Sequence, residues 1–161
     1  MNREGHAGLS LILFSPVIFL FRSLGADMTN VLMTGLLMAG LSSVPDFDLE
    51  WHIKHRGVTH TVLFGLAAGV SFAVLLGMYA FGSWGWSMGF IAGFGGTLSH
   101  LLGDALTYQK FQPLWPFSDK EVAYGFFAAS NRAVNNAMLV LGGISFILSY
   151  EPSIIQRLLN I

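Results

Sequence analysis

Long apolar segments alternate with short polar connections along the chain. The apolar segments run from Ala7 to Phe21, Met28 to Val44, Val58 to Phe81, Trp84 to Ala105 and Ala133 to Tyr150. A helix needs about 20 apolar residues to cross the hydrocarbon core of a bilayer, and in lipid its backbone groups must bond internally. The pattern therefore predicts an all-α fold, an integral membrane bundle of about five transmembrane helices. We expect residues 1–161 to form a single domain.

Glycines recur at a spacing of four in the two longest segments. Gly65 precedes Gly69, and Gly89 precedes Gly93. Small residues at this spacing let two helices approach closely inside a membrane. We therefore expect these glycines to serve helix packing.

The composition supports a membrane protein and excludes several kinds of site. The chain is 53% apolar and 11% charged, whereas a soluble domain is about 25% charged. The formal net charge of −1 gives no indication of a nucleic-acid partner. Since there is no cysteine, disulfides, thiolate metal sites and cysteine nucleophiles are excluded.

Ionisable residues concentrate between Pro45 and Thr61. Three of the nine acidic residues and three of the five histidines fall there, namely Asp46, Asp48, Glu50, His52, His55 and His60. Such a concentration in an apolar chain predicts a functional site. Two carboxylates on alternate positions of an extended segment diverge, so we expect one of Asp46 and Asp48 to bind an ion and the other to orient a histidine.

The five-span topology brings further ligands to the same membrane face. His6 precedes the first span, and His100 and Asp104 lie at the end of the fourth, so all five histidines share one side. Four residues apart on a helix, His100 and Asp104 face the same way. The expected metal ligands are Asp46, Asp48, His55, His60, His100 and Asp104, with His6 as an additional ligand. Imidazole and carboxylate together suit one or two divalent ions, most of all Zn²⁺, with Mn²⁺ or Mg²⁺ as alternatives.

Other residues near these ligands fit a substrate. The planar guanidinium of Arg56 matches a phosphate, and we expect Asp46, Arg56 and Thr59 to be catalytic. Thr107 and Lys110 are expected to bind substrate together with Arg56. Pro113 and Pro116 predict a rigid flap over the site, beyond the fourth span.

Basic residues predict the orientation of the bundle. The face that carries the predicted site holds six Lys or Arg residues and the opposite face holds two. Because cytoplasmic loops are enriched in Lys and Arg, we expect a multi-pass protein of the inner or plasma membrane with its active site on the cytoplasmic face.

Several short motifs together resemble the YdjM-like inner-membrane proteins. They are Gly5-His6, Pro45-Asp46-Phe47-Asp48, the run from His55 to His60, the run from Ser99 to Thr107, and Pro113-Leu114-Trp115-Pro116. They follow the order of that family and span most of the chain. The chain departs from the family at Thr61, where serine is usual, and at Tyr108, where proline is common. The resemblance implies a membrane-embedded metal-dependent hydrolase that uses the six ligands named above.

The residues and the resemblance lead to one expected function and two alternatives. We expect a metal-dependent hydrolase that cleaves a phosphoester of a membrane lipid or lipid-linked substrate with a metal-activated water. The alternatives are a membrane transporter that binds its cargo cation and a non-catalytic scaffold with a structural metal. Membrane lipids are the expected partners, and the sequence carries no expectation about the oligomeric state.

Overall fold

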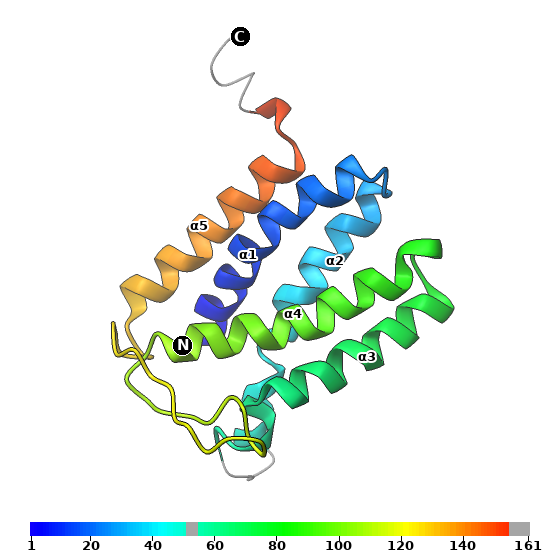
Figure 1. Ribbon diagram of the computed structural model, residues 1–161. Coiled ribbons are helices and arrows are strands. Elements are labelled where there is room, and N and C mark those ends of the chain that lie inside the picture. The colour runs from blue at the N-terminus through cyan, green and yellow to red at the C-terminus, as the bar shows by residue number, and fades with distance from the viewer. Residues whose placement is uncertain (51–54, 155–161) are drawn as a thin grey trace.

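The computed structural model describes residues 1–50 and 55–154. Its helices are α1 (Arg3–Ser23), α2 (Met28–Leu41), α3 (Val62–Tyr79), α4 (Gly85–Ala105) and α5 (Arg132–Tyr150), with the 3₁₀ turns η1 (Val44–Leu49), η2 (Val58–His60) and η3 (Gly82–Trp84). Each long helix lies within a few residues of a predicted apolar segment. The predicted all-α bundle is thereby confirmed (Figure 1).

Polar caps explain where four of the five long helices begin. The side chains of Asn2, Asp27, Thr61 and Asn131 each accept a hydrogen bond from the backbone N–H three residues later, at 2.9–3.2 Å. Such a cap satisfies one of the free N–H groups at a helix start. Helix α4 has no side-chain cap and instead continues directly from η3. The helix boundaries are therefore set largely by local sequence.

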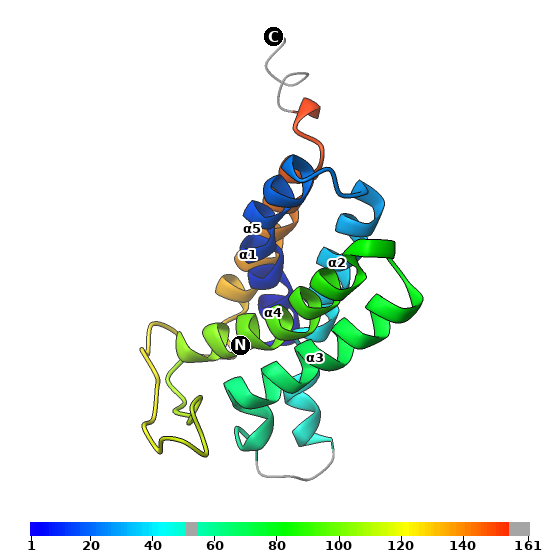
Figure 2. The same cartoon turned by 45° about the vertical axis from the view of Figure 1, so that its right-hand side comes forward.

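Helix α4 is the centre of the bundle. It contacts α1, α2 and α3, while α5 packs on the far side of α1. The pairing of α3 with α4 and of α1 with α5 is visible in both views (Figures 1 and 2). More than half of the α4 residues are buried, including the predicted ligands His100 and Asp104 in its last two turns.

Glycines allow α3 and α4 to touch backbone to backbone. A Cβ atom on Gly89 would collide with the carbonyl oxygen of Phe72, and one on Gly93 would collide with that of Ala68. The predicted role of these glycines in close packing is therefore confirmed. The contact matters for function because α3 follows His60 directly and α4 carries His100.

Length and composition fit a membrane environment. Four helical stretches of the described chain are long and apolar enough to cross a bilayer, namely Arg3–Ser23, Met28–Leu49, Val62–Tyr79 and Arg132–Tyr150. Large apolar side chains such as Val70 and Met78 on α3 and Val140 on α5 are more than half exposed. Many exposed large apolar side chains are costly in water and favourable in lipid.

One end of the bundle gathers the polar elements. Arg3 of α1 pairs with Glu50 at 2.9 Å, which ties the start of the chain to the end of η1. Residues 106–131 cover the same end, and short bridges between Thr107 and Phe127 and between Phe111 and Val122 hold their path. In Figure 1 this yellow-green segment lies near the chain start and near η1 and η2. The predicted site residues meet at this end.

Candidate metal centre

Seven buried or half-buried side chains converge at this end of the bundle, and we call them the histidine–aspartate cluster. They are His6, Asp46, Asp48, His55, His60, His100 and Asp104. They come from α1, η1, the η2 region and the last two turns of α4. Three overlapping groups of their ligand atoms lie within 4.8 Å of one another: His6 with His100 and Asp104, Asp46 with His60 and His100, and Asp48 with His55 and His60. Buried His and Asp groups of this kind can coordinate a metal ion.

The centre of the cluster is a triangle of ligand atoms. His60 Nε2 lies 3.1 Å from His100 Nε2, and Asp46 Oδ1 lies 3.5 Å from each of them. Asp104 Oδ2 faces the same two nitrogens at 3.6 and 3.8 Å. Ligands about 2.1 Å from one ion lie about 3.0–3.4 Å apart in octahedral or tetrahedral sites. The spacing of the triangle therefore fits a shared divalent ion.

Hydrogen bonding fixes the protonation of His100. Its Nδ1 lies 2.7 Å from the carbonyl oxygen of Ser42. Because a carbonyl oxygen only accepts, Nδ1 must carry the proton. In the neutral imidazole the lone pair is then on Nε2, which points toward His60.

The same reasoning applies to His60. Thr59 Oγ1 donates to Asp48 Oδ2 at 2.9 Å, and His60 Nδ1 lies 3.1 Å from that hydroxyl oxygen and 3.4 Å from Asp48 Oδ2. Nδ1 therefore donates, and the lone pair is on Nε2. Two Nε2 lone pairs consequently face each other at 3.1 Å. Between two neutral rings that arrangement is repulsive, and either a bound metal ion or a proton on one of the two Nε2 atoms would relieve it.

Asp48 is an acceptor for several donors. It is fully buried, and it accepts from the backbone N–H of Arg56 at 3.1 Å and lies 2.9 Å from His55 Nδ1. It faces the Nδ1 side of His60, whereas Asp46 faces the Nε2 side. The expectation of an extended segment here was wrong, because η1 is a 3₁₀ helix. Both carboxylates reach His60 since the two ring nitrogens lie on opposite sides of the imidazole.

Arg56 lies in the wall of the cluster. Its side chain is 8% exposed, and Nη2 contacts Asp104 Oδ2 at 2.7 Å while Nη1 donates to the carbonyl of Gln109. The guanidinium also lies 6.0 Å from the centroid of the Phe111 ring. Its Nε is buried without a hydrogen-bond partner among the described residues. Arg56 has φ +61°, an uncommon value for a residue with a side chain.

Asp104 makes the largest number of polar contacts in the cluster. Besides Arg56 and the two imidazoles, its Oδ1 accepts from the amino group of Met1 at 2.5 Å. The cluster and its wall thus hold three carboxylates, those of Asp46, Asp48 and Asp104, and two cations, the guanidinium and the amino group, both of which contact Asp104. With neutral histidines the described cluster has one negative charge in excess. A divalent cation would reverse that balance and leave the centre positive.

His6 stacks on the back of His100. The ring centroids are 3.9 Å apart and the planes differ by 17°, while His6 Nε2 lies 3.4 Å from Asp104 Oδ1. Neither ring nitrogen has a hydrogen-bond partner among the described residues, although the side chain is fully buried. Gly103 makes room for the ring, since a Cβ there would lie 2.8 Å from His6 Nδ1. His6 is thus placed where an additional ligand could contribute.

Of the predicted catalytic and substrate-binding residues that remain, Thr59 and Thr107 contact the cluster and Lys110 does not. Thr59 joins Asp48 to His60, as described above. Thr107 is fully buried, and its hydroxyl donates to the backbone carbonyl of Asp104 at 2.8 Å. Lys110 is 68% exposed and pairs with Glu121 at 3.5 Å, so it is not brought into the cluster. His52 lies outside the described residues.

Two residues that contact the histidine–aspartate cluster could not be predicted from the sequence. Ser42 acts through its backbone carbonyl, which fixes His100, and a backbone group leaves no trace in residue type. Phe111 places its ring centroid 6.3 Å from that of His60 and closes the cluster on the side of residues 106–131. It is one of 14 phenylalanines in the chain, so its role had no distinguishing signal.

Comparison with known proteins identifies the family of the chain. The model of the family described as YdjM inner membrane protein matches residues 1–158. Neither the curated proteins nor the solved structures include a match. The match extends over nearly the whole chain, including every residue of the cluster and all five long helices. The chain therefore belongs to the YdjM inner membrane protein family.

Proposed function

We propose that the protein is a membrane-embedded metal-dependent hydrolase that cleaves a phosphoester of a membrane lipid or lipid-linked substrate. The observation that carries this proposal is the approach of His60 Nε2 and His100 Nε2 to 3.1 Å beside Asp46 Oδ1, which lies 3.5 Å from each. Two imidazoles and a carboxylate with no thiolate are typical of sites that keep a position open for water or substrate.

A divalent ion, Zn²⁺ by preference and Mn²⁺ or Mg²⁺ as alternatives, supplies Lewis acidity and lowers the pKa of water when bound. Asp46, His60, His100 and Asp104 would hold it, and His6 would be the further ligand for a second ion if the Met1 amino group left Asp104 Oδ1. Asp46 is 17% exposed, whereas Asp48 and Asp104 are almost fully buried. Asp46 is therefore the most accessible of the three carboxylates, and we assign the acceptance of a proton from water to whichever of its oxygens does not bind the ion.

Asp48 and Thr59 are assigned a positioning role. Together they hold the Nδ1 proton of His60, which aims Nε2 at the centre of the cluster. Partners of this kind fix the orientation of a ligand histidine and raise its basicity. Thr59 already donates its hydroxyl proton to Asp48, so it acts through His60 and Asp48 instead of contacting substrate.

Arg56 is the reason for favouring a phosphoester. Its Nε is a buried donor without a partner among the described residues, and an anionic oxygen in the cluster would satisfy it. The positive balance that a divalent ion would create also favours an anionic substrate. A guanidinium beside the reacting group would then stabilise the charge that develops there.

The distribution of ionisable groups argues against a transport pathway. In the described helices, Asp, Glu, Lys, Arg and His side chains occur only in the first or last two turns, at Arg3, Glu4, His6, Arg22, His100, Asp104 and Arg132. Pathways for ions usually place such groups within the membrane. We further propose that the cluster lies on the cytoplasmic face, because six of the eight basic residues lie on that side in the five-span topology.

Release of phosphate from lipids tests the proposed reaction. The full chain, purified in detergent and loaded with Zn²⁺ or Mn²⁺, is incubated with a phospholipid and isoprenoid-phosphate panel, and inorganic phosphate and phosphorylated headgroups are measured. We expect turnover that is lost in Asp46→Asn and retained in Lys110→Ala, whose side chain is exposed away from the cluster. Turnover in Asp46→Asn equal to that of the unmodified chain would contradict the proposal.

A further inference from the structure

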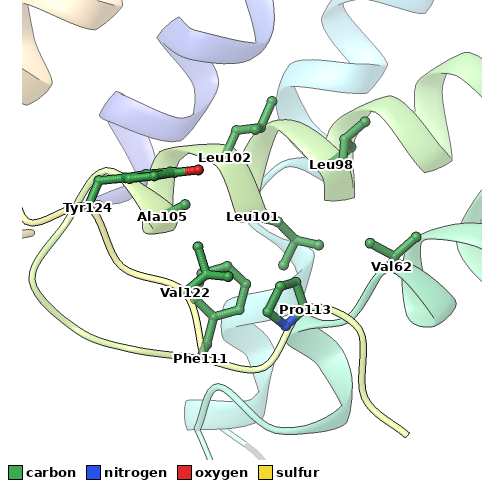
Figure 3. A pocket seen from close by; sticks show the side chains of 9 residues that line it. All are labelled: Val62, Leu98, Leu101, Leu102, Ala105, Phe111, Pro113, Val122 and Tyr124. Atoms are coloured by element: carbon green, nitrogen blue, oxygen red, sulfur yellow. The ribbon is translucent and has the colours of Figure 1, made fainter. Parts of the chain in front are cut away.

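An apolar pocket lies beside the cluster, between α4 and residues 106–131. It has a volume of about 160 Å³ and is lined by Val62, Leu98, Leu101, Leu102, Ala105, Phe111, Pro113, Val122 and Tyr124. In Figure 3, Phe111, Pro113 and Val122 face Leu101 and Ala105 of α4. The backbone bonds between Phe111 and Val122, and from Val62 N–H to the carbonyl of Pro113 at 2.8 Å, hold these walls together.

The pocket and the cluster share a wall. Phe111 lines the pocket, and its other neighbours are the His60 ring and the Arg56 guanidinium, whose distances are given above. On α4, Leu101 and Ala105 of the pocket directly follow His100 and Asp104 of the cluster. One molecule could therefore place a charged end in the cluster and an apolar end in the pocket.

Two residues of the pocket lining reach the molecular surface. Leu102 on α4 is 46% exposed and Tyr124 in residues 106–131 is 67% exposed, so the pocket can be reached from outside at this edge. An apolar cavity of about 150 Å³ holds a molecule with about six carbon atoms, such as benzene. The pocket thus matches a short length of aliphatic chain entering from the bilayer.

We propose that this pocket binds the part of an aliphatic chain next to the anionic headgroup of a lipid. The distribution of polar groups supports a lipid as the occupant. The unpartnered Nε of Arg56 and the histidine–aspartate cluster lie on one side of Phe111, and the pocket on the other side has an apolar lining. An amphiphile with an anionic head satisfies both sides at once. The inference rests on the proposed function for the nature of the headgroup, and it assigns the substrate class as a lipid with an unbranched or isoprenoid chain.

Binding of alkylphosphonates tests this proposal independently of hydrolysis, because their carbon–phosphorus bond is not cleaved by a phosphoester hydrolase. The full chain, loaded with Zn²⁺ and held in an amphipol, is titrated by calorimetry with methyl- to octylphosphonate. Each buried methylene should tighten binding by about fourfold, up to about six carbons. Longer chains should gain little because the pocket is then filled.

Two filling variants and one matched control locate the effect. Leu102→Trp and Val122→Phe add bulk to the pocket from α4 and from residues 106–131, and either should reduce the total gain from methyl- to octylphosphonate to less than about twofold. Leu75→Trp makes the same kind of change on α3 at a position that is 49% exposed and outside the pocket. It should behave like the unmodified chain.

The outcomes separate this proposal from the proposed reaction. A chain-length gain that both filling variants lose and the control keeps supports the pocket, even if no lipid phosphate is released in the hydrolysis assay. An equal gain in the filling variants overturns it, as does the absence of any chain-length gain or of any binding in the unmodified chain. If Leu102→Trp does not fold, Val122→Phe alone decides.

Discussion

Replacing Asp48 by asparagine tests whether Asp48 binds the metal ion itself or only orients the ligand His60. Asp48 is fully buried and lies on the Nδ1 side of His60, away from the face-to-face Nε2 atoms. The asparagine side chain would keep a similar shape and one oxygen acceptor, and it would lose the negative charge. We therefore expect Asp48→Asn to weaken metal binding without removing the site.

The contacts of Asp48 set the expected magnitude. If the asparagine oxygen takes the place of Oδ2, it still accepts from the Arg56 N–H and from Thr59. The weaker acceptor then holds the His60 proton less firmly. Loss of such a partner costs about 10- to 100-fold in metal affinity, which corresponds to about 1.4–2.7 kcal/mol. Asp48→Ala should cost more, because it leaves buried donors unsatisfied at about 1–3 kcal/mol each.

Competition with a chelating indicator measures this effect. The purified full chain and each variant are titrated with Zn²⁺ in the presence of the indicator, which gives both the affinity and the number of ions bound at saturation. Glu50→Gln is the matched control, since Glu50 lies two residues away, is 59% exposed and pairs with Arg3. Its affinity should stay within about twofold of that of the unmodified chain.

Two results would refute this reasoning. An affinity for Asp48→Asn within about twofold of the original value would mean that the His60 proton needs no charged partner. A full loss of bound ion at saturation would mean that Asp48 is itself a required ligand.

Three further predictions follow from the packing, the guanidinium and the topology. Gly89→Ala should lower the free energy of unfolding in detergent by about 1–3 kcal/mol, because the added Cβ would meet the backbone of α3. Gly40→Ala is the control and should be neutral or stabilising, because a Cβ there would meet open space. Equal thermal stabilities of the two variants would contradict the α3–α4 contact. Arg56→Lys should retain the bound metal and weaken inorganic phosphate binding by about tenfold or more, as measured by calorimetry. An unchanged phosphate affinity would contradict the role of Arg56 in binding the phosphate group. In this cysteine-free chain, an impermeant maleimide applied to intact cells should label Ser23→Cys and spare Asp119→Cys; the reverse labelling would place the cluster outside the cytoplasm.

The positions of the helices could be predicted because they depend on local signals. The apolar length of each segment and the capping side chains at Asn2, Asp27, Thr61 and Asn131 act over a few residues. The glycine spacing likewise predicted close helix packing at these positions, although not which helices would pair. Such signals are present in residue type and need no knowledge of distant contacts.

The convergence of the histidines followed from topology, but their protonation did not. Placing His60 and His100 at one membrane face required only the number of spans. The Nδ1 proton of His100 depends on the carbonyl of Ser42, 58 residues away. A backbone carbonyl is present at every position, so sequence could not indicate which one would be used.

Long flexible side chains were the least predictable part of the site. Arg56 was expected to hold substrate, and in the structure its fork is largely occupied by Asp104 and the Gln109 carbonyl, which leaves only Nε without a partner among the described residues. Lys110 was expected nearby and instead pairs with Glu121 on the surface. The end of a long side chain can lie several ångströms from its backbone position, so its partner depends on the path of residues 106–131.

The metal content of the purified full chain tests the central claim most directly. After reconstitution with Zn²⁺, Mn²⁺ or Mg²⁺ and removal of loosely bound ions, elemental analysis should find at least about one ion per chain for one of these metals. The double variant His60→Ala, His100→Ala should contain none, while Glu121→Gln on the exposed surface should match the unmodified chain. A background metal content in the unmodified chain, or an unchanged content in the double variant, would contradict the account.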